Sequence, residues 1–151
     1  PGLVRRLLES EVPEIFDGTV EIKSVSREAG SRSKIAVYSA DENVDPVGAC
    51  IGQRGARVNK IVDILGGEKL DIVRYSENPA EFVAASLAPA DVISVEILSE
   101  EEHSCRVVVP NNQLSLAIGN KGQNARLAAK LTGWKIDINP ETEEAVINFD
   151  E

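Results

Sequence analysis

The chain has 151 residues, of which 42% are hydrophobic and 27% charged, and its formal net charge is −9. This length suits one ordinary domain or two small ones, and the apolar content excludes gross disorder. No apolar run reaches the length of a membrane span, and no charged-then-apolar leader is present, so we expect no membrane partner. The acidic balance argues on average against nucleic acid, but the positions of the charges decide this question.

The first half begins with a predicted helix followed by two strands. Within LVRRLLESEV (3–12) the apolar residues share one helical face: Leu3, Val4, Leu7 and Leu8. Pro13 is expected to end this helix. The alternating segments TVEIKSV (19–25) and SKIAVYS (33–39) predict strands, joined by a turn that contains Gly30.

A short glycine loop comes next, in CIGQRGARVNK (50–60), where Gly52 and Gly55 enclose a polar and a basic residue. The apolar residues after it recur at helical spacing and predict one apolar face: Val58, Ile61, Val62 and Leu65. Gly66 and Gly67 are expected to stop this helix, and KLDIV (69–73) predicts a strand.

The second half starts with Asn78 and Pro79, a favourable N-cap and first helical residue. The apolar side of this predicted helix consists of Phe82, Val83 and Leu87. Strands are predicted for DVISVEI (91–97) and CRVVV (105–109). A polar link near 75–78 separates the halves, so we expect domains at 1–76 and 77–139, followed by an acidic tail at 140–151.

The glycine loop is repeated 67 residues later, in AIGNKGQNARLAAKLTGWKIDI (117–138), where Gly119 and Gly122 enclose Asn120 and Lys121. In both copies Ile precedes the loop, and a helix, a glycine stop and a short strand follow it. The expected apolar face of the second helix is smaller: Ala125, Ala128, Ala129 and Thr132. One G-x-x-G is weak evidence, but two in the same context indicate duplicated domains. Each half therefore predicts helix, strand, strand, short helix, loop, helix and strand.

The segments around both loops contain no acidic residues. Residues 46–62 and 106–136 contain no Asp or Glu, although the chain holds 25 of them. The basic residues of the two windows are Arg54, Arg57, Lys60, Arg106, Lys121, Arg126, Lys130 and Lys135. We therefore expect an acidic protein with two locally basic surfaces.

The loops suit a nucleic-acid backbone. Glycine lets a strand approach the main chain closely, and the N-terminus of the following helix favours a phosphate. An apolar floor for unpaired bases is expected from Ile51 or Ile118 and from the last strand of each half. Only 4% of the residues are aromatic, so we do not expect stacking of bases on aromatic side chains to be the main mode of nucleic-acid binding.

No catalytic or metal-binding pattern stands out. Cys50, Cys105 and the single His103 do not make up a zinc site, and reduced structural thiols are the expected role of the cysteines. No cofactor is expected.

These motifs resemble KH domains, and the segments 27–37, 48–58, 67–73 and 112–138 resemble the paired KH domains of the bacterial NusA family. The resemblance covers about residues 1–139. It implies two type II (prokaryotic) KH domains, an α+β fold with helices on one face of each three-stranded sheet. It also implies a non-enzymatic, cytoplasmic role in transcription elongation, termination and antitermination. Because the chain begins at Pro1 and holds no Met, we expect an excised fragment.

The resemblance implies that both loops contact one strand of single-stranded RNA, the nascent transcript, and that the parent protein contacts the RNA polymerase elongation complex. The fragment itself is expected to be a monomer. The RNA-binding residues carried over are Ile51, Gly52, Gln53, Arg54, Gly55, Arg57, Ile72, Ile118, Gly119, Asn120, Lys121, Gly122, Gln123, Asn124, Arg126 and Ile136.

Three basic residues near the first hairpin, Arg27, Arg32 and Lys34, could contact RNA or a neighbouring domain, or lie on a solvated hairpin. An RNA role predicts that Arg32→Glu with Lys34→Glu weakens binding several-fold.

Other functions remain as alternatives. These are a tandem KH protein of ribosome assembly or RNA decay, a protein-interaction module with vestigial loops, and an enzyme that binds a nucleotide phosphate. An enzyme is disfavoured, because the sequence contains neither a G-x-x-x-x-G-K-[ST] phosphate-binding loop nor a nucleophile paired with a base.

Overall fold

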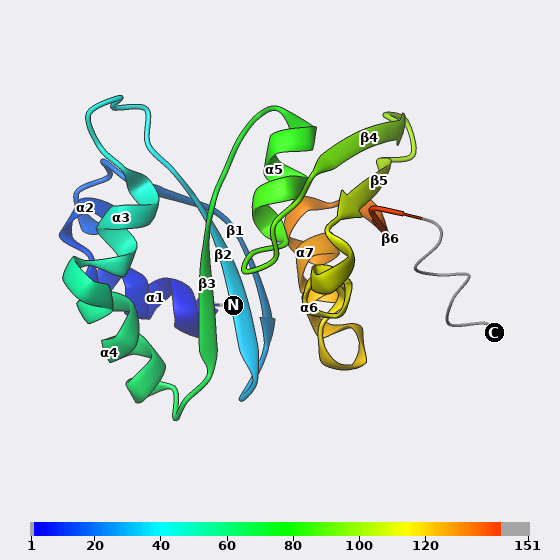
Figure 1. The fold of residues 1–151 in the computed structure, drawn as a ribbon. Coiled ribbons are helices and arrows are strands. Elements are labelled where there is room, and N and C mark those ends of the chain that lie inside the picture. Colours follow the sequence, from blue (N-terminus) through cyan, green and yellow to red (C-terminus); the bar gives the residue numbers. More distant parts are fainter. Residues whose placement is uncertain (1, 143–151) are drawn as a thin grey trace. The chain divides into compact units, whose positions relative to one another are not determined.

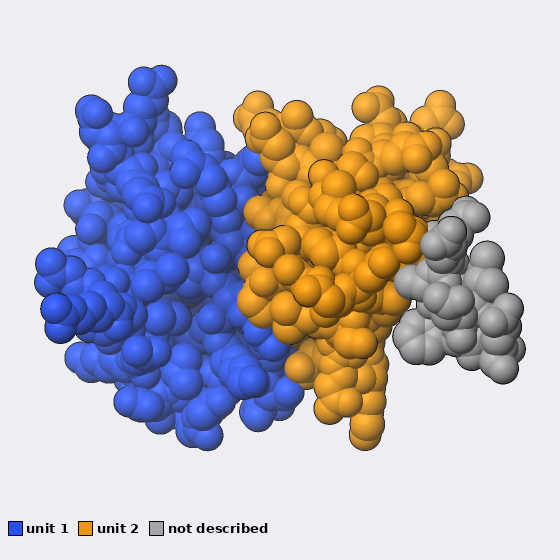
Figure 2. Space-filling model, in the orientation of Figure 1, with its two compact units in different colours: residues 1–76 blue, residues 77–151 orange. Residues whose placement is uncertain are grey.

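The computed structural model describes residues 2–142, which form two compact units that meet in sequence at Ser76 and Glu77 (Figure 1). Figure 2 colours the two units separately. Each unit combines helices with one three-stranded mixed sheet, which confirms the expected α+β fold. Most of the predicted acidic tail, residues 143–151, lies outside the described residues. No helix within residues 2–142 is long and apolar enough to cross a membrane.

The first unit follows the predicted order with one extra short helix. Its elements are α1 (Gly2–Glu11), α2 (Pro13–Phe16), β1 (Glu21–Glu28), β2 (Arg32–Tyr38), α3 (Pro46–Ile51), η1 (Gln53–Gly55), α4 (Ala56–Ile64) and β3 (Lys69–Arg74). β1 pairs antiparallel with β2, and β2 pairs parallel with β3, which leaves β3 at one edge. Pro13 ends α1 as predicted and also begins α2, because the first turn of a helix tolerates a missing N–H.

The second unit repeats this topology. Its elements are α5 (Pro79–Ser86), β4 (Ser94–Ser99), β5 (Ser104–Val109), η2 (Asn111–Gln113), α6 (Leu114–Ile118), η3 (Asn120–Gly122), α7 (Gln123–Thr132) and β6 (Lys135–Pro140). β5 pairs antiparallel with β4 and parallel with β6. The predicted N-cap is confirmed, because Asn78 Oδ1 accepts hydrogen bonds from the N–H groups of Ala80 and Glu81 at 3.0 and 3.4 Å.

In each unit the helices pack against one face of the sheet. The first core contains Val4, Leu8, Val12, Val20, Ile35, Val37, Cys50 and Ile61. The second contains Val83, Leu87, Ala90, Cys105, Val107, Val109, Ala117, Ala128 and Trp134. In Figure 1, α1, α3 and α4 lie on the same side of the β1–β3 sheet.

Two details of the predicted apolar faces are wrong. Leu3 is 49% exposed, because the buried face of α1 is centred on Val4 and Leu8, four residues apart, and Leu3 lies at its edge. The buried face of α7 is Asn124, Leu127, Ala128 and Leu131, so it is shifted by about one position from the predicted alanine face. The large side chains of Leu127 and Leu131 are buried, and they determine which face of α7 packs against the core. The small Ala125 does not.

The first unit contains a buried carboxylate, Glu68, which is 1% exposed. Both Glu68 carboxylate oxygens accept hydrogen bonds from Arg27, at 2.9 to 3.2 Å. The Gly30 N–H and the Ser33 hydroxyl each donate to it at 2.8 Å. Burial alone would raise the pKa of Glu68, but these hydrogen bonds outweigh it and hold the pKa below its usual value.

A second cluster joins β2 to β3. Arg32 donates two hydrogen bonds to Asp71, at 2.7 and 2.9 Å, and the buried Lys34 Nζ donates one at 2.8 Å. Burial lowers the pKa of Lys34 below its usual value, although the negative charge of Asp71 acts to raise it. Burial would raise the pKa of Asp71, but Arg32 and Lys34 lower it below its usual value.

Of the three alternatives for the basic hairpin, the solvated one is wrong. Arg27, Arg32 and Lys34 lie in β1 and β2, and each forms an ion pair with a carboxylate at or near β3. Arg32→Glu with Lys34→Glu would place three carboxylates together in a largely buried site and unfold the unit. Such a variant would not report on RNA contacts.

Glu68→Gln is expected to lower the free energy of unfolding by about 3 kcal/mol at pH 7, because Arg27 loses its charged partner in a largely buried site. A carboxylate with a depressed folded pKa stabilises the fold above its unfolded pKa and loses this contribution as pH falls through the folded pKa. The difference between variant and wild type should therefore narrow below about pH 4. Urea unfolding followed by circular dichroism across this range measures it.

The matched control is Glu42→Gln, which changes the same group at an exposed position between β2 and α3 and should behave like wild type at every pH. A difference between Glu68→Gln and wild type that stays constant down to pH 2 would contradict the assigned pKa direction.

Candidate nucleic-acid interface

The two glycine loops have the same backbone conformation. The first glycines, Gly52 and Gly119, have φ/ψ of 77°/174° and 84°/170°. The second glycines, Gly55 and Gly122, have 76°/14° and 76°/12°. The sequence repeat is thus also a repeat of geometry. The basic residue between the glycines, Arg54 or Lys121, also lies in the left-handed region, with φ of 54° and 56°.

The first glycine of each loop is required by packing. A Cβ atom on Gly52 would lie 2.8 Å from Arg57 Cγ, and one on Gly119 would lie 2.6 Å from the backbone N of Asn124. Side chains cannot be accommodated at these distances, and the positive φ adds strain. The glycines therefore bring each loop directly against the helix that follows it.

Each loop leads into a helix N-terminus without acidic residues. α4 and α7 begin directly after the second glycine, and neither has Asp or Glu in its first turn. The N–H groups of Ala56 and Gln123, which begin the two helices, donate to the carbonyls of Gln53 and Asn120 within the loops. Each loop is thereby held at the positive end of the helix dipole. The loop tips next to them are exposed: Gln53, Arg54, Asn120 and Lys121. This arrangement suits an anionic backbone.

The residues expected to form an apolar floor lie on two elements of each unit. Ile51 and Ile118 end α3 and α6, and Ile118 is 37% exposed. Ile72 and Ile136 are half-buried on the edge strands β3 and β6, which contact α3 and α6 respectively. In each unit the helix that ends at the loop thus contacts the edge strand, and an apolar floor made by these residues stays a prediction. Among the described residues, the outer edges of β3 and β6 pair with no further strand.

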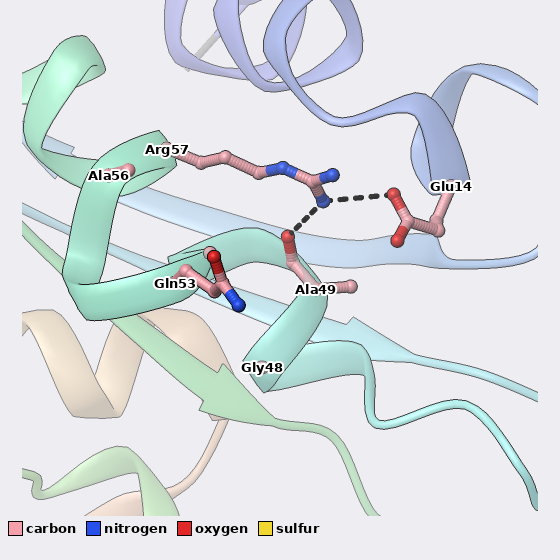
Figure 3. A pocket seen from close by; sticks show the side chains of 7 residues that line it. Glu14, Gly48, Ala49, Gln53, Ala56 and Arg57 are labelled. Carbon is pink, nitrogen blue, oxygen red and sulfur yellow. Dashed lines mark hydrogen bonds and ion pairs between the residues drawn. The ribbon is translucent and has the colours of Figure 1, made fainter.

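Arg57 already has partners. Its Nη1 donates to the Ala49 carbonyl at 2.7 Å and to Glu14 Oε1 at 2.9 Å (Figure 3). The guanidinium therefore joins α4 to α3 and to α2. Its charge is offset by a carboxylate, which makes it a weak phosphate ligand in this arrangement.

The equivalent residue of the second loop, Asn124, is 2% exposed. Its side-chain amide donates to the carbonyls of Ala117 and Leu87 at 2.8 and 3.1 Å. Asn124 is thus placed to hold α6 and α7 together and does not face solvent. Arg126 is exposed and donates to the Lys121 carbonyl at 3.1 Å, and the half-buried Gln123 is the first residue of α7.

The two loops differ in net charge. Lys60 pairs with Glu11 at 3.1 Å and Arg57 pairs with Glu14, so two of the three cations of the first window have acidic partners from α1 and α2. Within residues 2–142 no ion pair involves Lys121 or Lys130. The prediction of two locally basic surfaces is thus weakened at the first loop. In the second window Arg106 pairs with Asp137 at 3.9 Å, away from the loop, so the second loop keeps more of its positive charge.

Glu14 and the open hollow of about 600 Å³ beside it are not predicted by the sequence. The hollow is lined by Glu14, Gly48, Ala49, Gly52, Gln53, Ala56 and Arg57 (Figure 3). Glu14 lies 43 residues before Arg57, in a short helix that periodicity does not reveal. No local signal in the sequence connects the two.

The cysteines do not provide a nucleophile. Cys50 and Cys105 are free and buried. Burial raises the pKa of Cys50 to about 12 and also raises the pKa of Cys105, so both are thiols at neutral pH. Across the described part of the chain, no group of three His, Cys, Asp or Glu residues could hold a metal ion.

The family models and the curated relatives that this chain matches belong to the same family. Residues 1–75 match the family model for the NusA-like first KH domain, and residues 79–146 match the model for the NusA-like second KH domain. The chain is 64% identical over 143 residues to the "Transcription termination/antitermination protein NusA" of Halalkalibacterium halodurans and to that of Bacillus subtilis. It is 58% identical over 138 residues to the protein of the same name from Mycobacterium tuberculosis.

These alignments cover 95%, 95% and 91% of this chain but only 37%, 38% and 40% of the relatives. The chain therefore spans about two fifths of the length of the curated relatives that it matches. A solved structure described as "Crystal structure of APE1850" has a TM-score of 0.62 over 91% of this chain and 96% of that chain. At 22% identity this likeness concerns the fold alone.

Gly119→Ala is expected to lower the free energy of unfolding by about 2 to 3 kcal/mol, because it adds a clash with Asn124 to an unfavourable φ. Gly133→Ala is a matched control in the same unit, with φ of 77° and nothing within 4 Å of the added Cβ. It should cost only the strain of a left-handed alanine, about 1 kcal/mol. Urea unfolding monitored by circular dichroism compares them, and equal losses would contradict the close approach.

Proposed function

This chain belongs to the NusA family, whose first and second KH domains its two units match, and we propose that it binds single-stranded RNA through both glycine loops. KH domains bind RNA, and their G-x-x-G loop clamps the backbone of about four nucleotides. The role is one of binding, without catalysis. Sugar-phosphate groups would lie on the loop and the helix N-terminus, and bases on the adjacent apolar floor.

One observation carries this proposal. The two loops share a backbone conformation that turns an exposed basic tip outward and places acid-free first turns of α4 and α7 beside it. Glycine packing alone explains the turn but gives no reason for a cation at both tips. Phosphate recognition accounts for the exposed Arg54 and Lys121 and for the missing acidic residues together.

The wider role extends the proposal to the parent protein. The relatives are named transcription termination/antitermination proteins, so we infer that the RNA is a nascent transcript in the cytoplasm. Contacts with RNA polymerase would then be made by the longer protein. The separate matches to both NusA-type KH domains favour this role over ribosome assembly or RNA decay. We propose a monomer that engages one strand with both loops, since the second contact then becomes intramolecular.

Reversing the charge of either loop is expected to weaken RNA binding by about tenfold or more, because phosphate contacts supply most of the affinity. One variant carries Gln53→Asp with Arg54→Asp, and the other Asn120→Asp with Lys121→Asp. The second variant should lose more affinity, since fewer acidic partners offset the positive charge of the second loop. Fluorescence anisotropy of a short single-stranded RNA at two salt concentrations measures affinity, and the salt slope should fall by about 0.7 per lost phosphate contact.

The control carries Arg6→Asp with Ser10→Asp, which makes the same charge change at exposed positions of α1. It should retain most of the affinity, and circular dichroism checks that all three variants fold. If the folded loop variants bind RNA like wild type, the loops are only turns and RNA binding through them is refuted.

A further inference from the structure

We propose that the hollow beside the first loop, between Glu14 and Arg57, is a base-binding site that selects guanine in the RNA strand held by that loop. This inference rests on the proposed RNA binding and adds sequence selectivity to it. The hollow is distinct from the apolar floor that Ile51 and Ile72 form.

The hollow has the size and lining of a base site. Its volume of about 600 Å³ falls within the range of small-molecule sites, roughly 300 to 1,000 Å³. Part of its wall is made of small residues, Gly48, Ala49 and Ala56, against which a flat ring can lie. Three polar side chains complete it: Glu14, Gln53 and Arg57. All three are accessible, since Glu14 and Arg57 side chains are 34% and 31% exposed and Gln53 is exposed.

The charges of the hollow argue against a phosphate. Glu14 Oε1 lies 2.9 Å from Arg57 Nη1, so the pair is close to neutral. A phosphate placed beside Arg57 would also lie beside a carboxylate, and this repulsion would offset most of the attraction. A neutral ligand with both donors and acceptors suits the pair better.

Guanine is the base whose edge matches this pair. Its Watson–Crick edge carries two adjacent donors, N1–H and N2–H, next to the O6 acceptor. A carboxylate accepts from two donors at once, and a guanidinium retains several N–H groups after one bond is made. Glu14 therefore accepts from N1–H and N2–H, and Arg57 or Gln53 donates to O6. Adenine and uracil do not present two adjacent donors to the carboxylate.

The hollow is connected to the proposed strand through the loop itself. Gly52 and Gln53 belong both to the glycine loop and to the hollow's lining (Figure 3). A nucleotide whose phosphate lies on the loop is thus adjacent to the hollow through its own base or that of a neighbour.

Among the residues described for the second unit, no pair equivalent to Glu14 and Arg57 lies beside the loop. There the position of Arg57 is taken by the buried Asn124, whose amide donates to two backbone carbonyls. Within the described residues of the second unit, no helix corresponding to α2 lies between α5 and β4. Guanine selectivity is accordingly a property of the first loop.

The test uses uridine octamers that carry one guanosine, moved through each position, and the same set with adenosine. Wild-type protein is expected to bind the guanosine octamer about tenfold tighter than the adenosine octamer at one position or at adjacent positions, as for one bidentate base contact. Glu14→Gln keeps the side-chain size but replaces one acceptor by a donor. Its guanosine preference should fall to about twofold or less. It should bind the all-uridine octamer at least as tightly, because a negative charge near the strand is gone.

Glu11→Gln is the matched control. It removes the same charge from a glutamate that pairs with Lys60 of α4 but does not line the hollow, and it should keep the guanosine preference. Inosine lacks the N2 amino group of guanosine. Replacing guanosine by inosine should therefore weaken octamer binding to the wild type and leave octamer binding to Glu14→Gln unchanged.

Three results overturn the proposal: no guanosine preference in wild type, a preference that survives in Glu14→Gln, or a preference lost equally in Glu11→Gln. Each leaves RNA binding through the loops intact. Failure of the wild type to bind any octamer instead refutes the proposed function, and the base site with it.

Discussion

The structure depends on the close approach between the first glycine of each loop and the residue five positions later. At both Gly52 and Gly119 the following helix lies so near that a Cβ atom cannot be placed. This approach sets the direction in which α4 and α7 begin. It therefore orients the first-turn N–H groups and turns Arg54 and Lys121 outward. If this contact were relaxed, the shared loop geometry on which the proposed RNA binding depends would be lost.

The residue that meets the glycine also braces the turn, but the two units use different chemistry. Arg57 ties α4 to the Ala49 carbonyl and reaches on to Glu14. Asn124 makes the comparable bond to the Ala117 carbonyl and a further one to Leu87, entirely in the interior. A neutral amide can be buried at moderate cost when its donors are satisfied, whereas a guanidinium needs a counter-charge or water. The charged Arg57 therefore lies partly exposed beside the hollow, whereas the neutral Asn124 is buried.

Much of the fold could be predicted because the signals are local. Glycine spacing, helical periodicity, strand alternation and the Asn78 cap all act over a few residues, and the repeat reinforces each of them. The ion pairs could not be predicted, since Glu68 is 41 residues from Arg27 and Glu14 is 43 residues from Arg57. The basic hairpin was misinterpreted for this reason: a count of charges along the chain does not register partners on a distant strand. The face of α7 was displaced because alanine is compatible with both sides of a helix.

Pairing of charges across the sequence also explains how an acidic chain can suit RNA. The net charge of −9 includes glutamates that lie against the cations of the first loop, so neither the whole-chain charge nor the acid-free window describes that surface. The second loop keeps Lys121 and Lys130 without ion-pair partners among the described residues. Unpaired cations attract phosphates whatever the sequence, whereas a paired cation and carboxylate can distinguish one base edge from another. If the proposed base site holds, the two loops, alike in backbone, serve different tasks: the second contributes affinity, and the first discriminates between bases.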